Sequence, residues 1–224
     1  VARMLTKNQD TIKDFKTGFL PIVIPVMIIC GLILPSNFST AAILFATCMI
    51  LMFIGRIKIK YLFALIGIFV LILSIFISVS IFTGKKGRIG TWQKRVENFF
   101  KKDDPDGNYQ VNQAKIAIAT GGVFGKGPGN STQRNFLPQP YSDFIYAVIV
   151  EEYGFLGGII ILLLYLILLF RSVRIVTTHP STFAALLGMG CCIQLIMQAM
   201  INMAVAVNLI PVTGQALPLL SMGG

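Results

Sequence analysis

The chain has 224 residues, of which 55% are hydrophobic and 12% are charged, and its formal net charge is +10. Soluble domains carry roughly 25% charged residues, so this composition excludes a disordered chain and an ordinary soluble enzyme. The positive charge is divided among short segments between apolar runs, which argues against a nucleic-acid-binding surface. Runs of this length are typical of membrane-spanning helices. We therefore expect an all-α integral membrane protein, a polytopic helical bundle.

The apolar runs predict the membrane spans Phe19–Leu34, Phe38–Gly55, Tyr61–Phe82, Phe144–Phe170 and Phe183–Leu209. They divide the chain into a cytoplasmic interfacial segment (1–17), three spans within 18–82, a large structured extracytoplasmic loop (83–143), two spans within 144–209 and a re-entrant or extracytoplasmic tail (210–224). The loops 56–60 and 171–174 are both basic and fall on the same side of the membrane. The positive-inside rule therefore predicts that both are cytoplasmic.

The N-terminal segment, residues 1–17, mixes basic and apolar side chains. This mixture predicts a helix that lies on the anionic cytoplasmic surface of the membrane. A solvated connector from a preceding span is the alternative.

The outer loop, residues 83–143, is long for a compact membrane protein, and loops of such length tend to be functional or disordered. Its composition is not that of a disordered segment, because it holds Trp92 and an amphipathic helical stretch between Asn108 and Gly121. The preceding residues 103–107 predict a turn, with a site for a hard cation as the alternative. The glycine-rich run 121–130 predicts either a tight turn or a nest of N–H groups that binds phosphate, with Lys126 adding charge.

Asp143 stands where the outer loop enters the fourth predicted span. Two roles are open for it. The Asp143 carboxylate or the Ser142 hydroxyl could cap the following helix. Alternatively, the carboxylate is well situated at the membrane edge to act as a base on a lipid-borne substrate.

Further polar residues lie inside the last two predicted spans. Glu151 and Glu152 are costly to bury in lipid, so at least one must face a cavity or a basic partner such as a loop arginine. Gln194, Gln198 and Asn202 recur every four residues, and such a stripe either binds neighbouring helices or lines a substrate cavity. Beyond them, the broken stretch 211–218 is predicted to dip back into the membrane as irregular backbone.

Taken together, these stretches resemble the SEDS family (shape, elongation, division and sporulation), the FtsW/RodA group. The matching residues, in family order, are Arg88, Arg95, Tyr109-Gln110, Gln113, Gly121–Gly127, Leu137-Pro138, Asp143–Ile145, Glu151–Gly154, Gln198, Asn202, Pro211, Thr213-Gly214, Leu217-Pro218 and Ser221–Gly224. Residues 32–41 resemble the division branch more than the elongation branch. Gln139 and Met222 depart from the usual family pattern, and neither affects Asp143.

The resemblance implies a peptidoglycan glycosyltransferase that polymerises lipid II, an undecaprenyl-diphosphate-linked substrate, on the outer face of the bacterial cytoplasmic membrane. It implies a class B penicillin-binding transpeptidase and other division or elongation proteins as partners, and no nucleic acid. Asp143 would be the catalytic carboxylate. The predicted substrate-binding residues are Arg88, Arg95, Gln110, Lys126, Arg134, Glu151, Gln198 and Asn202. A divalent cation (Mg²⁺ or Mn²⁺) is a further candidate for holding the diphosphate, and its ligands are unknown.

This chemistry agrees with the residue pattern. A lipid diphosphate is already a good leaving group, so the reaction needs one base for the acceptor hydroxyl and positive charge for the departing diphosphate. A single Asp143 is then enough, unlike the acid/base pair of a glycosidase. Two other functions remain open: a lipid II flippase that uses the amide stripe and the buried acids as a polar path, and a scaffold that only recruits the transpeptidase.

Overall fold

A computed structural model describes residues 1–222 except residues 10, 83–89, 91–94, 96–98 and 101–108. Arg88, Trp92 and the predicted turn 103–107 therefore lie outside the described residues. Within the described part of the chain every regular element is a helix, which confirms the predicted all-α fold. In that same part, three helices are long and apolar enough to cross a membrane, Phe15–Ile33, Ile145–Thr178 and Thr182–Ala206, and Phe38–Ile54 and Ile59–Ile75 are shorter apolar helices.

The chain divides into two compact units. The first unit comprises residues 1–92 and 172–194, and the second comprises residues 93–171 and 195–224. The two longest helices that could span a membrane, α7 (Ile145–Thr178) and α8 (Thr182–Ala206), contribute residues to both units.

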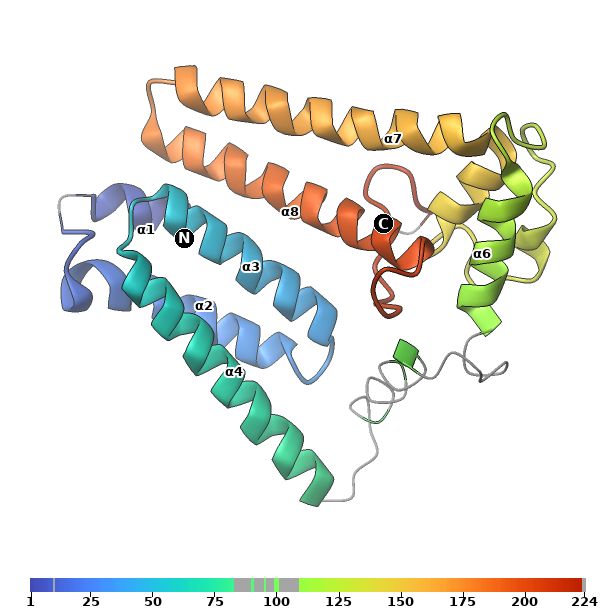
Figure 1. Ribbon diagram of the computed structural model, residues 1–224. Helices are drawn as coiled ribbons and strands as arrows, with labels where there is room; N and C mark the ends of the chain where they lie inside the picture. Colours follow the sequence, from blue (N-terminus) through green and yellow to red (C-terminus); the bar gives the residue numbers. More distant parts are fainter. Residues whose placement is uncertain (10, 83–89, 91–94, 96–98, 101–108, 223–224) are drawn as a thin grey trace. The chain divides into compact units, whose positions relative to one another are not determined.

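In the first unit, short turns connect the helices α1 (Ala2–Lys7), α2 (Leu20–Ile33), α3 (Phe38–Ile54) and α4 (Ile59–Phe82), with a π-helical turn (Phe15–Phe19) before α2. The side chain of Asn37 accepts the N–H of Thr40 (3.3 Å), a typical N-cap that starts α3. Helices α2 and α3 lie side by side (Figure 1). The rings of Phe45 in α3 and Phe69 in α4 stack with centroids 4.2 Å apart.

The N-terminal segment does not form the continuous helix predicted for residues 1–17. Helix α1 ends at Lys7, and turns follow before the π-helical turn begins at Phe15. Phe15 is 48% exposed, but two of the apolar side chains predicted to face the lipid surface, Leu5 and Ile12, are buried in the first unit (0% and 5% exposed). Packing of these two side chains against protein is the physical reason for the difference.

Helix α7 is longer than the predicted span, since it continues through the basic residues 171–174 as far as Thr178. These residues were expected to form a loop. The helix instead ends two residues before Pro180, because a proline disfavours helical backbone in the residue that precedes it. The basic side chains are thus on the last turns of α7.

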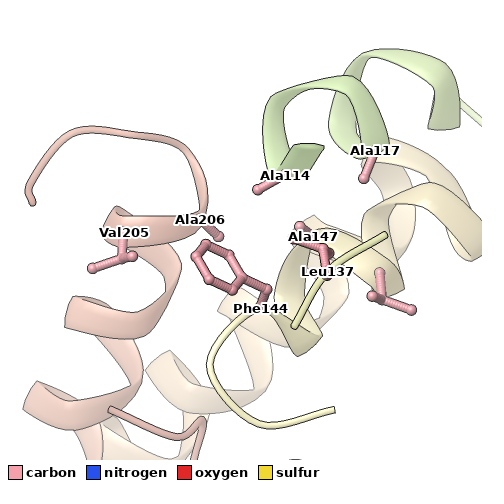
Figure 2. Packing of buried hydrophobic residues seen from close by; sticks show 8 residues of the cluster. Ala114, Ala117, Leu137, Phe144, Ala147, Val205 and Ala206 are labelled. Atoms are coloured by element: carbon pink, nitrogen blue, oxygen red, sulfur yellow. The ribbon is translucent and has the colours of Figure 1, made fainter. Parts of the chain in front are cut away.

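The second unit contains α6 (Tyr109–Gly121), a 3₁₀ turn (Gln133–Asn135), most of α7 and the end of α8. Small side chains dominate its buried core, which lets α6 pack closely on the start of α7. The core residues are Ala114, Ala117, Leu137, Phe144, Ala147, Val148, Val205 and Ala206. Figure 2 shows the Phe144 ring pointing toward Ala206 at the end of α8. Burial of Phe144 fixes the position of the residue before it, Asp143.

Candidate functional site

The turn that leads into α7 carries Asp143, whose side chain is half-buried. Helix α7 begins at Ile145, and the carbonyl of Phe144 accepts the N–H of Ala147 (3.0 Å). The Ser142 hydroxyl donates to Asp143 Oδ1 (3.1 Å). Among the described residues, neither of these two side chains bonds an N–H group of α7, so the structure does not show the cap that the sequence allows. The Asp143 carboxylate keeps one oxygen, Oδ2, for other partners.

That oxygen faces Gly214, which lies in the broken segment 211–218. Gly214 has a positive φ of 68°. An ideal Cβ on Gly214 would lie 3.6 Å from Asp143 Oδ2 and 3.8 Å from Arg95 Nη1. The Arg95 guanidinium is held there by a hydrogen bond from Nη1 to the carbonyl of Val212 (3.1 Å). A carboxylate and a guanidinium therefore flank the same bare stretch of backbone.

The amide stripe on α8 binds protein groups. Gln194 Oε1 accepts the hydroxyl of Thr47 (2.7 Å) within the first unit. In the second unit, Gln198 Nε2 donates to the carbonyl of Ala216 (3.0 Å), and Asn202 donates to the segment 211–218 as well. Gln194 thus binds a neighbouring helix, as one interpretation of the stripe predicts, whereas Gln198 and Asn202 bind the non-helical segment 211–218.

Glu151 is fully buried at 0% exposure and is surrounded by donors. Its partners are Lys126 Nζ (2.6 Å), the hydroxyls of Thr120 (3.5 Å), Ser131 (2.5 Å) and Thr132 (2.9 Å), and the N–H groups of Thr132 (3.2 Å) and Gln133 (3.2 Å). Of the two environments that the sequence allows, a cavity or a basic partner, Glu151 has the basic partner, and it is a lysine from the glycine-rich loop and not an arginine. Glu151 and Lys126 thus bond each other. A contact of either residue with the substrate stays a prediction.

The glycine-rich loop packs on an interruption of α7 at Gly154, whose backbone angles (φ 73°, ψ −175°) are not helical. Backbone bonds between loop and helix replace the lost helical ones: Lys126 N–H to Glu151 O (3.0 Å), Gly127 N–H to Glu152 O (2.9 Å), Phe155 N–H to Gly122 O (2.9 Å) and Leu156 N–H to Val123 O (3.3 Å). Since loop N–H groups already have carbonyl partners, the geometry favours the tight turn over a phosphate-binding nest.

The remaining predicted site residues are not brought to Asp143 by any contact between described residues. Gln110 is exposed in the first turn of α6. Arg134 lies in the 3₁₀ turn, where its backbone N–H donates to the Ser131 hydroxyl (3.2 Å). Arg88 lies outside the described residues. Their roles stay predictions.

No group of three His, Cys, Asp or Glu side chains suited to a metal ion occurs among the residues that the structure describes. The carboxylates of residues 103, 104 and 106 lie outside those residues, so the use of Mg²⁺ or Mn²⁺ stays a prediction.

Two residues that the sequence left without a role contribute to the site. Gly214 lies close to both Asp143 and Arg95, and the Ser221 hydroxyl donates to the carbonyl of Ser142 (2.9 Å). The available signal was their place in the family-like stretches at the end of the chain. This signal identified no partner for either residue, because the residues that Gly214 and Ser221 contact are far from them in sequence.

Comparison with known proteins identifies the family. The family model for FtsW, RodA and SpoVE, described as cell cycle protein, matches residues 1–224. Stage V sporulation protein E of Bacillus subtilis is 35% identical over 230 residues, covering 100% of this chain and 60% of the relative. The probable peptidoglycan glycosyltransferase FtsW of Geobacter sp. strain M18 is 34% identical over 233 residues, with the same coverage of 100% and 60%.

A solved structure shares the fold. A chain from a peptidoglycan synthase complex, described by its structural coordination of polymerization and crosslinking, superposes with a TM-score of 0.68 at 20% identity, covering 97% of this chain and 60% of that one. The chain thus spans about 60% of the length of the curated relatives it matches. Because the family model matches every residue, the chain belongs to the FtsW/RodA/SpoVE family of cell cycle proteins.

Proposed function

We propose that the protein containing this chain is a peptidoglycan glycosyltransferase that polymerises lipid II, with Asp143 as its catalytic base. The observation that supports the proposal most is the pairing of Asp143 Oδ2 and Arg95 Nη1 around the bare backbone of Gly214. A carboxylate and a cation close to the same glycine are the two groups that the reaction needs. The naming of relatives as probable peptidoglycan glycosyltransferases supports the same activity.

In the proposed reaction, the Asp143 carboxylate takes the proton of the acceptor sugar hydroxyl while the hydroxyl oxygen attacks the anomeric carbon of the donor. The bond from that carbon to the diphosphate oxygen breaks, and the lipid diphosphate leaves with the bonding electrons. Arg95 stabilises the negative charge that develops on the diphosphate, and Arg88 and Arg134 are further candidates for this role. The proton on Asp143 passes to water before the next cycle.

We also propose that the reaction takes place on the extracytoplasmic face of the bacterial cytoplasmic membrane, with a class B penicillin-binding transpeptidase as partner. The long apolar helices support a membrane location. The similar solved chain comes from a complex described as coordinating polymerization and crosslinking, which supports a crosslinking partner.

The test is glycan-strand synthesis from purified lipid II by the full-length protein with its transpeptidase partner. Asp143→Asn keeps the size of the side chain but removes the base, so we expect polymer formation to fall by about 100-fold or more. Asp14→Asn is the matched control, because Asp14 is exposed in the N-terminal segment. We expect this control to polymerise at the wild-type rate.

Polymer synthesis by Asp143→Asn at the wild-type rate would contradict the role of Asp143 as base. If the wild-type complex made no polymer but moved labelled lipid II across vesicles, the flippase would replace the glycosyltransferase. If the wild-type complex neither made polymer nor moved lipid II, and only bound the transpeptidase, the scaffold function would replace the glycosyltransferase.

A further inference from the structure

The turn that carries Asp143 has its backbone held at three successive residues. The N–H of Met222 donates to the carbonyl of Tyr141 (2.9 Å), and the Ser221 hydroxyl donates to the carbonyl of Ser142 (2.9 Å). Asn202 Nδ2 donates to the carbonyl of Asp143 itself (2.8 Å). The donors come from α8 and from the chain after it, far from the turn in sequence.

These bonds affect where α7 starts. If α7 extended further toward its N-terminus, the carbonyls of residues 141–143 would accept the N–H groups of residues 145–147. Each of the three carbonyls instead has a donor from another part of the chain, so these bonds stabilise the turn in its non-helical form. Asp143 thus lies in a non-helical turn directly before α7.

Asn202 is the most buried of the three donors, at 1% exposure. Its Nδ2 donates to the carbonyl of Asp143 and also to the carbonyl of Gln215 (2.7 Å). The opposite amide orientation would direct Oδ1 at both carbonyl oxygens, so the observed orientation is fixed. Among the described residues Asn202 Oδ1 has no hydrogen-bond partner.

The second acceptor connects Asn202 to the rest of the site. Gln215 directly follows Gly214, the residue that Asp143 Oδ2 and Arg95 Nη1 both approach. A single amide group therefore sets the spacing between the backbone of Asp143 and the backbone that carries Gly214. A shift of the reacting groups by about 1 Å can reduce an enzymatic rate by about 100-fold.

We propose that Asn202 is a positioning residue, which holds the Asp143 carboxylate at a fixed distance from Gly214 and Arg95 and does not itself contact the substrate. The proposal rests on the proposed function, since it takes Asp143 as the base. It replaces the substrate-binding role that the sequence predicts for Asn202. Ser221 supports the same turn from the neighbouring carbonyl.

The test compares Asn202→Leu with Gln194→Met in the full-length protein bound to its transpeptidase partner. Both changes replace an amide of the stripe with an apolar side chain, but Gln194 is half-buried and bonds Thr47 and not the turn. For Asn202→Leu we expect kcat to fall by about 10-fold to 100-fold, with KM for lipid II within about threefold of wild type. For Gln194→Met we expect an unchanged kcat.

Ser221→Ala provides a second measurement if Asn202→Leu does not fold. It removes the donor to the Ser142 carbonyl from a half-buried position, and we expect kcat to fall by about tenfold at an unchanged KM.

An increase in KM at wild-type kcat would make Asn202 a substrate contact and overturn the proposal. Wild-type kcat in both Asn202→Leu and Ser221→Ala would overturn it too. If the proposal for Asn202 fails in this way while Asp143→Asn is inactive in the same assay, the proposed function is not affected. If Asp143→Asn is active, the assignment of the base fails first.

Discussion

Replacing Glu151 with alanine is expected to destabilise the protein strongly. The substitution leaves the ammonium group of Lys126 without its carboxylate (2.6 Å away), and it also removes the acceptor for Ser131 and Thr132. The Lys126 side chain is 30% exposed and can bind water, so the main cost comes from the donors around the fully buried carboxylate, about 1–3 kcal/mol of unfolding free energy for each donor left buried without an acceptor. We therefore expect the midpoint temperature of unfolding in detergent to fall by several degrees or the protein to fail to accumulate.

The neighbouring residue provides the control. Glu152 is half-buried, and the group of Glu152 that bonds the loop is its backbone carbonyl, which accepts the N–H of Gly127 (2.9 Å). Glu152→Ala keeps this bond, so we expect a change in unfolding free energy of less than about 1 kcal/mol. The two substitutions are at adjacent positions of α7, so the difference between their unfolding free energies reports on the buried carboxylate of Glu151.

The outcome also decides between two roles for Glu151. If Glu151→Ala unfolds at the wild-type temperature but no longer supports glycan synthesis, the carboxylate contacts the substrate, as the family resemblance predicts. If the Glu151→Ala protein is less stable but each folded molecule still synthesises glycan at the wild-type rate, the role of Glu151 is to hold the glycine-rich loop on α7. The surrounding donors, which saturate both carboxylate oxygens, favour the second result.

Much of the fold follows from local sequence. Apolar runs predict helices at the positions of α2, α3, α4, α7 and α8, and the stretch between Asn108 and Gly121 predicts α6. The boundaries are less well predicted, since α7 continues through residues 171–174, where charge suggested a loop. Charge alone does not end a helix, whereas the backbone restriction before Pro180 does. In residues 1–17 the sequence predicts one helix, whereas α1 ends at Lys7 and the side chains on either side of the break, Leu5 and Ile12, are buried.

The site is less predictable because its contacts are long-range. A carboxylate at the membrane edge points to Asp143, and the sequence predicts that Glu151 or Glu152 faces a cavity or a basic partner. Neither signal identifies Gly214 beside Asp143 or Lys126 beside Glu151, because these pairs are separated by 71 and 25 residues. A single sequence carries no information about which distant residues meet. The interruption of α7 at Gly154 is also invisible in an otherwise regular apolar helix.

That interruption gives the second large effect. Gly154 combines φ 73° with ψ −175°, a backbone region that residues with a Cβ essentially never adopt. A Cβ at this position would also collide with the backbone of Val123 and of Gly125 in the loop. We expect Gly154→Ala to cost about 3 kcal/mol or more, from backbone strain of about 1–3 kcal/mol together with overpacking of a similar size.

Gly188→Ala is the matched control, because an ideal Cβ on Gly188 in α8 has no heavy atom within 4 Å. Alanine is the better helix former by about 1 kcal/mol, so this variant is expected to unfold at or slightly above the wild-type temperature. A Gly154→Ala protein as stable as Gly188→Ala would contradict the interruption of α7 and the loop contacts that depend on it. A large loss confined to Gly154→Ala would mean that the glycine pair, Gly125 and Gly154, exists so that two backbones can pack without side chains between them.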